Sequence, residues 1–266
     1  MRTPLPHTPF LPKALGALTA ATALALAVPA TGAAAAPAGH PLPHIVGGGT
    51  ASQTYSFMIS LQQDGSHVCG ASLISPTWAV TAAHCVSGAT PDQFTVRVGS
   101  TDRTGGGEVT GLSRIVVHPN YSTNNDIALL QLSSPVQAAP IRIADSAPVG
   151  TATRLLGWGQ ETPQPGGDGG PDQLKELDTS LVADGCAEGF DAGSELCVNN
   201  PQGPDGSNQG ACYGDSGGPA IARVNGDWQL IGATSRSGGD ATCAVNPSIY
   251  TNVTAFADFV RTTTAG

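Results

Sequence analysis

The chain has 266 residues, with 20 acidic and 11 basic side chains and a formal net charge of −9. A nucleic-acid partner is not expected, because the sequence has no cluster of basic residues that could displace the counterions of a phosphate backbone. Its 35 glycines and 21 prolines separate short apolar runs, and only 12% of the residues are charged. Short apolar runs separated by turn residues are typical of all-β proteins, and the length is sufficient for a large core.

Residues 1–36 are expected to be a signal peptide that is not part of the fold. Arg2 and Lys13 precede an uncharged run over residues 14–28, and four alanines stand at 33–36. A charged, an apolar and a small-residue region follow one another in this order in secretory leaders. The run is too short and too rich in Ala and Thr to span a membrane. We therefore expect a secreted, extracellular protein without a membrane span in its mature form, and the Ala-rich leader suggests a bacterial source.

Six cysteines are expected to form disulfides. An exported chain meets an oxidising environment, and no Cys-x-x-Cys occurs that would favour a zinc or thioredoxin-like site. Spacing alone leaves the pairing of the six cysteines open.

Short apolar runs predict two sets of β-strands. The first set is expected at residues 56–61, 71–75, 78–82, 94–98, 113–117 and 127–132. The second set is expected at residues 152–158, 174–182, 219–223, 228–234 and 249–253. Two comparable sets suggest two similar modules in tandem, at about 45–150 and 151–266.

The end of the chain has a different period. Apolar side chains recur there at the spacing of a helix, at Val253, Phe256, Phe259 and Val260. This pattern predicts a short amphipathic helix, which we expect to pack on the second module.

Three segments carry the residue types that nucleophilic catalysis needs. Residues 81–85 read Thr-Ala-Ala-His-Cys and contain His84, and residues 125–129 read Asn-Asp-Ile-Ala-Leu and contain Asp126. Ser216 lies among small residues in a Gly-Asp-Ser-Gly-Gly sequence. A serine needs a neighbouring base, which an imidazole can provide, and a carboxylate can orient that imidazole. Taken singly, the three residues could also be a surface histidine and ordinary turn residues.

In their order and flanking residues, these segments resemble the chymotrypsin- and trypsin-like serine proteases. The resemblance covers about residue 45 to the end of the chain. It implies an all-β fold of two tandem six-stranded antiparallel Greek-key barrels with a short C-terminal helix. His84 and Asp126 would come from the first barrel and Ser216 from the second, with the cleft between them. The backbone amides of Gly214 and Ser216 would form the oxyanion hole.

The same resemblance implies which cysteines pair. The implied disulfides are Cys69–Cys85, Cys186–Cys197 and Cys212–Cys243. Some relatives bind calcium in a loop of the first barrel, but the corresponding residues 99–108 carry only two carboxylates. Since calcium prefers six to eight oxygen ligands, we expect neither a metal nor a cofactor.

Residues 45–48, Ile-Val-Gly-Gly, resemble the N-terminus that zymogens of this family expose on cleavage. Residues 37–44 are therefore expected to be a short propeptide. The freed ammonium of Ile45 would pair with the carboxylate of Asp215, since a buried charge needs a partner. His44 precedes the cleavage point, so trypsin is not the expected activator and the activating protease stays unidentified. Alternatively, Ile45 and Val46 simply begin a β-strand and have no role in activation.

The primary pocket departs from the trypsin pattern. Where trypsin has an aspartate that selects Arg and Lys, this chain has Gly210, followed by Ala211. The expected walls are Ser235, Ser237 and Ser248, of which the last two replace glycines that would leave the pocket wide. A substrate cation would lack a counter-charge there. We therefore expect uncharged residues at P1, the position before the cleaved bond.

The expected protein is thus a monomeric, secreted serine endopeptidase that acts on proteins or peptides. A non-catalytic binding or regulatory homologue on the same fold is the alternative, although such proteins usually lack one member of the triad. An esterase or lipase would carry its histidine last in the chain, and the order here contradicts that arrangement.

Overall fold

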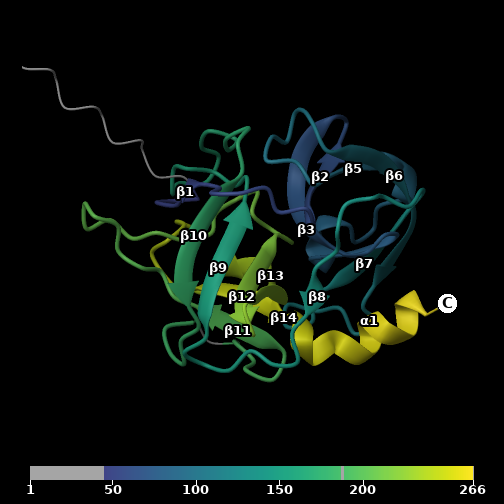
Figure 1. Cartoon of the computed structure of the whole chain (residues 1–266). Helices are drawn as coiled ribbons and strands as arrows, with labels where there is room; N and C mark the ends of the chain where they lie inside the picture. The colour runs from purple at the N-terminus through teal and green to yellow at the C-terminus, as the bar shows by residue number, and fades with distance from the viewer. Residues whose placement is uncertain (1–44, 187–188, 266) are drawn as a thin grey trace, which may run out of the picture. The chain divides into compact units, whose positions relative to one another are not determined.

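The computed structural model describes residues 45–186 and 189–265, so the expected signal peptide and propeptide lie outside the described residues. The described residues belong to one compact unit. They form β-strands, short 3-10 turns and a C-terminal helix (Figure 1). The expected all-β class is therefore confirmed. No helix in these described ranges has the length and apolar character needed to cross a bilayer.

Six strands of the first half close into an antiparallel barrel. They are β2 (Met58–Gln63), β3 (Ser66–Ser75), β4 (Trp78–Thr81), β5 (Phe94–Val98), β6 (Glu108–Val117) and β7 (Ala128–Leu132), in the order β2-β3-β4-β7-β6-β5. Every strand expected in this half is present. In β5, Phe94, Val96 and Val98 are buried while the residues between them are more exposed, as the period of two requires. The closed barrel leaves no strand edge open.

The second half forms a larger sheet than the expected six-stranded barrel. It contains β9 (Ala152–Gly157), β10 (Lys175–Ser180), β11 (Glu195–Val198), β12 (Pro219–Val224), β13 (Asp227–Ser237) and β14 (Ser248–Asn252). Two short strands from the first half of the chain join it, β1 (Gly49–Thr50) beside β10 and β8 (Arg142–Ile143) parallel to β13. The main order is β1-β10-β9-β12-β13-β14-β11. A bridge between Leu181, which follows β10, and Val198 brings the two ends of the sheet together.

Strands β1, β8 and β11 were not predicted. The first two contain two residues each, too few for a period to be visible. β11 begins with Glu195, a charged side chain that interrupts the apolar pattern although the whole strand is buried.

The C-terminal segment packs against both halves: its 3-10 turn contacts β13 of the second half, as expected, and it also contacts the first barrel. It consists of a 3-10 turn, Val253–Phe256, and helix α1, Ala257–Thr264 (Figure 1). The rings of Phe256 and Phe259 lie edge-on against His118, which follows β6, at centroid distances of 5.1 and 4.8 Å. Periodicity identified the apolar face of this helix but not the surface that covers it.

The two halves touch through backbone where β3 meets the loop that carries Ser216. The Gly70 amide donates a hydrogen bond to the Ser216 carbonyl at 2.7 Å. A Cβ atom at Gly70 would lie 2.6 Å from the Cα of Gly218, so a glycine is required at this approach. This contact fixes the serine loop against the barrel that carries His84.

Candidate active site

Neighbouring strands of the first barrel bring His84 and Asp126 together. His84 lies in a 3-10 turn, Ala83–Cys85, directly after β4, and Asp126 lies just before β7. β4 and β7 are paired with Thr81 opposite Ala128, so the end of one strand adjoins the start of the other. Ser216 comes from the loop between β11 and β12 in the second half.

Asp126 holds His84 through both carboxylate oxygens. The Nδ1 atom of His84 lies 2.6 Å from Oδ2, and the backbone N–H of His84 donates to Oδ1 at 2.8 Å. An ionised carboxylate only accepts hydrogen bonds, so the shared proton belongs to Nδ1. Nε2 is therefore the nitrogen that is available as a base.

Asp126 also accepts hydrogen bonds from the second half of the chain. Ser235 donates its hydroxyl to Oδ2 at 2.7 Å, and Thr251 donates to the Asp126 carbonyl at 2.8 Å. Burial would raise the pKa of Asp126, which is only 4% exposed, but the hydrogen bonds from His84 and Ser235 outweigh it and lower the pKa. The carboxylate therefore stays ionised at neutral pH. These contacts span more than a hundred residues of sequence and could not be predicted from motifs.

Ser216 and His84 line one pocket of about 500 Å³. Within the described residues, no hydrogen bond joins Ser216 Oγ to His84 Nε2. Such contacts are commonly long without substrate and tighten when it binds. The arrangement thus has a fixed Asp–His pair and a serine that faces the same space.

The backbone N–H groups of Gly214 and Ser216 are the expected donors of the oxyanion hole. No acceptor within the described ranges takes the N–H of either residue. His67 holds the loop, because its Nε2 lies 3.0 Å from the Gly214 carbonyl and its Nδ1 lies 2.9 Å from Ser60 Oγ. Burial lowers the pKa of His67 to about 4, so its ring is neutral and donates to Gly214. Sequence motifs did not identify His67.

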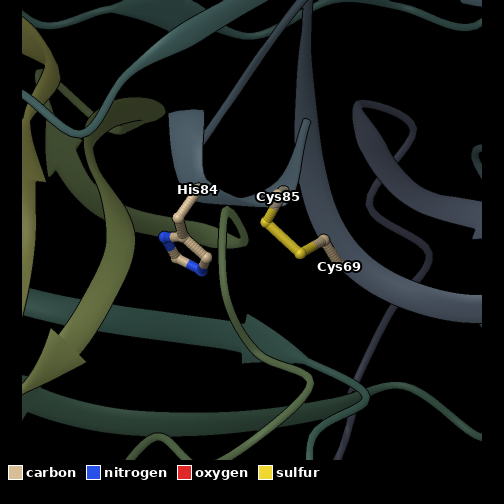
Figure 2. A group of neighbouring side chains, drawn as sticks. All are labelled: Cys69, His84 and Cys85. Carbon is tan, nitrogen blue, oxygen red and sulfur yellow. A yellow bond between two sulfur atoms is a disulfide. The ribbon is translucent and has the colours of Figure 1, made fainter. Parts of the chain in front are cut away.

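The cysteines form the disulfides Cys69–Cys85, Cys186–Cys197 and Cys212–Cys243, the three pairs that the resemblance implies. Figure 2 shows the first of them beside the imidazole of His84. The sulfur atoms and a ring nitrogen lie within 4.8 Å of one another, a spacing that could suggest a metal site. The sulfurs are bonded to each other and are not thiolate ligands, so this group is not a metal centre.

The primary pocket is lined by four of the five residues expected there, which are Ala211, Ser235, Ser237 and Ser248. The fifth, Gly210, is not among the residues that line this space, although its neighbour Ala211 is, so its place in the pocket stays a prediction. The N–H of Gly210 donates to the Val46 carbonyl at 2.8 Å. A Cβ atom at Gly210 would lie 2.5 Å from Asn200 Oδ1, which explains the glycine.

Tyr213 crosses the rim of this pocket. Its hydroxyl donates to the Ala241 carbonyl at 2.7 Å, and both residues line the pocket. Asp240, the carboxylate among the described lining residues, is exposed at the same rim. Ala211, Ser235, Ser237 and Ser248 contribute hydroxyl and aliphatic groups to the lining.

Asp215 is buried in the second half beneath the serine loop. Its carboxylate accepts the N–H of Gly159 at 2.8 Å and of Cys212 at 2.9 Å. Burial raises the pKa of Asp215 to about 6 against the opposing effect of these hydrogen bonds. A Cβ atom at Gly157 or Gly159 would overlap with a carboxylate oxygen, so both glycines make room for Asp215.

Comparisons with known proteins agree on the family of this chain. A family model described as Trypsin matches residues 45–260. The chain is 35% identical to "Serine protease 1" of Rattus norvegicus over 239 residues, which cover 83% of this chain and 90% of the relative. It is 34% identical to "Trypsin epsilon" of Drosophila erecta over 235 residues, which cover 82% and 87%. Both relatives are animal proteins, so the comparisons do not support the expectation of a bacterial source.

The hydrogen bond from Ser235 should stabilise the ionised form of Asp126. We expect Ser235→Ala to lower the free energy of unfolding by about 1–3 kcal/mol at pH 7, because a buried carboxylate loses a donor. The folded-state pKa of Asp126 is depressed, so this stabilisation is present above the ordinary value of 3.8 and is lost as the pH falls through the folded-state pKa.

Denaturant unfolding at pH 7 and pH 3 measures this effect, with Ser237→Ala as the matched control in the same pocket. An equal loss at both pH values would contradict the assigned contact.

Proposed function

Because the chain belongs to the trypsin family of serine proteases, we propose that it is an endopeptidase that hydrolyses peptide bonds through an acyl-enzyme on Ser216. The observation that carries this proposal is the His84–Asp126 pair, whose imidazole faces the same pocket as Ser216. Proteins and peptides are the substrates that this family implies.

In the proposed mechanism, His84 Nε2 takes the proton of Ser216 Oγ as the oxygen attacks the scissile carbonyl carbon. Asp126 stabilises the imidazolium that results. The developing oxyanion accepts hydrogen bonds from the N–H groups of Gly214 and Ser216, and one such donor typically contributes roughly a hundred- to a thousandfold to the rate. His84 then protonates the leaving amine, and a water activated by the same nitrogen hydrolyses the ester.

Loss of the nucleophile should abolish both covalent labelling and turnover. We expect a fluorophosphonate probe to label the active protein and not Ser216→Ala, and kcat to fall by about a millionfold in this variant. Ser113→Ala, which removes an exposed hydroxyl on the first barrel, serves as the control and should label normally.

Labelling of Ser216→Ala would contradict the assigned nucleophile. Absence of labelling and of hydrolysis in the processed wild-type protein would favour the alternative, a non-catalytic binding or regulatory homologue.

Secretion and activation by cleavage before Ile45 are part of the proposal. The order of charged, apolar and small residues in the expected signal peptide supports export. Ile45 is 1% exposed and has a φ of 48°, a left-handed conformation that costs a β-branched residue on the order of 1–3 kcal/mol. Cleavage would remove this constraint and create an ammonium group, for which the buried Asp215 carboxylate is a suitable partner. The activating protease must accept His44 before the cleaved bond.

The raised pKa of Asp215 predicts a pH dependence of the uncleaved chain. Between the ordinary value of 3.8 and about 6, the folded chain holds a proton that the unfolded chain has lost. The free energy of unfolding should therefore fall by about 3 kcal/mol as the pH rises from 4 to 7. Asp215→Asn should lack this component.

Denaturant unfolding of the two proteins, both carrying Ser216→Ala to prevent self-cleavage, measures the difference. After cleavage before Ile45, the ion pair should lower the pKa of Asp215 and remove the fall. Parallel pH profiles of the two proteins before cleavage would refute this account.

We also propose a preference for uncharged P1 residues. Ala211, Ser237 and Ser248 offer no counter-charge within the pocket, whereas Asp240 is exposed to water at the rim. We expect kcat/KM for peptides with Ala or Phe at P1 to exceed that for Arg by at least about tenfold, because a desolvated cation would be unpaired. A dominant preference for Arg that disappears in Asp240→Asn would overturn this prediction and assign selection to the rim.

A further inference from the structure

A second hollow adjoins the primary pocket at His84. It has a volume of about 490 Å³, and its lining includes Tyr121, Thr123, Asp126 and Arg236 together with His84. His84, Ser235 and Arg236 line both spaces. A peptide that places one side chain in the primary pocket therefore brings a nearby side chain to the second hollow.

Arg236 is held at this hollow by an ion pair with Glu195. Nη1 and Nη2 of Arg236 donate to the two carboxylate oxygens of Glu195, the latter at 3.1 Å, and Nη1 also donates to the Thr123 carbonyl at 3.0 Å. The side chain of Glu195 is 1% exposed, whereas that of Arg236 is 26% exposed. The pair thus presents its cation outward and its anion inward.

The carboxylate of Glu195 is occupied by donors from several segments. Besides Arg236, it accepts the Asn124 side-chain amide at 3.1 Å and the Asp191 N–H at 2.9 Å. A buried charge is tolerated when its hydrogen bonds are satisfied in this way. Because Glu195 is covered, a substrate in the second hollow cannot contact it.

The guanidinium of Arg236 retains donors for a ligand. The hydrogen bonds to Glu195 and Thr123 use both N–H groups of Nη1 and one of Nη2. The N–H of Nε and the second N–H of Nη2 donate to no acceptor within the described residues. Two N–H groups on one rigid plane suit the oxygens of a carboxylate.

No competing anion is accessible at the lining of this hollow within the described residues. The carboxylate of Asp126 is 4% exposed, and its oxygens accept hydrogen bonds from His84 and Ser235. Of the other lining residues in the described chain, Tyr121, Ser122, Thr123 and Ser235 present hydroxyl groups, and Arg236 presents a guanidinium. A side chain that enters the hollow meets one exposed cation and hydroxyl groups.

We propose that Arg236 is a specificity-determining residue that favours an acidic substrate side chain in the second hollow. Glu195 acts as a positioning residue, since it fixes the plane of the guanidinium. The inference rests on the proposed peptidase function and adds a preference at a position other than P1. The partial exposure of Arg236 and the nearby Glu195 charge limit the effect to that of a solvent-screened pair.

Matched peptides test this preference. A series with one cleavage site carries Glu, Gln or Lys in turn at each position from P4 to P3′. We expect kcat/KM to favour Glu over Gln by about fivefold at one position and to disfavour Lys there, with a preference that weakens as salt is added. Arg236→Gln should bring the Glu/Gln ratio close to one.

Arg261→Gln removes the same charge from an exposed site on α1 and should keep the wild-type ratio. If Arg236→Gln fails to fold, the Glu/Gln ratio of kcat/KM for the wild-type protein still shows whether an acidic side chain is preferred. Equal rates for Glu and Gln at every position would overturn the inference while leaving the peptidase function intact.

Binding separates this inference from the function on which it rests. Calorimetric affinities of the same Glu and Gln peptides for Ser216→Ala need no turnover, and we expect about the same fivefold ratio. If no peptide is cleaved, the proposed function is wrong, and this affinity ratio alone supports or overturns the role of Arg236.

Discussion

Asp126 accepts hydrogen bonds from both halves of the fold, and the geometry of the site depends on it. His84 from the first barrel contacts both of its carboxylate oxygens, and Ser235 from the second half contacts one of them. A second contact between the halves, from Gly70 to the carbonyl of Ser216, is made by backbone alone. The position of the imidazole relative to the serine loop is therefore set by short polar contacts across the interface, with little freedom for either side to slide.

Three buried carboxylates show three ways of tolerating a charge in the interior. Asp126 is stabilised by hydrogen bonds strong enough to lower its pKa. Glu195 is paired with the guanidinium of Arg236. Asp215 has only two backbone amides among its described partners, and its pKa is raised to about 6. The least compensated of the three lies beneath the loop of the proposed nucleophile, where an added cation would have the largest effect on loop order.

Local patterns predicted most strands and the three central residues. The strand at Phe94–Val98 follows a clear period of two, and His84 and Ser216 lie in distinctive local sequences. Properties that depend on distant partners could not be predicted in this way. The contact of Ser235 with Asp126 spans 109 residues, and the helical period at the C-terminus reveals an apolar face but not its partner. The buried strand β11 was not predicted, because it begins with the charged residue Glu195. Its burial depends on the ion pair with Arg236, which lies far along the chain.

The two ends of the described chain each contact the half of the fold that is more distant from them in sequence. β1, near the start, pairs with β10 in the second half, whereas α1, at the end, packs beside His118 of the first barrel. Each half therefore receives contacts from a segment that belongs to the other half in sequence. Contacts of this kind between the two halves favour unfolding in one cooperative step, because neither half can lose its structure without losing contacts of the other.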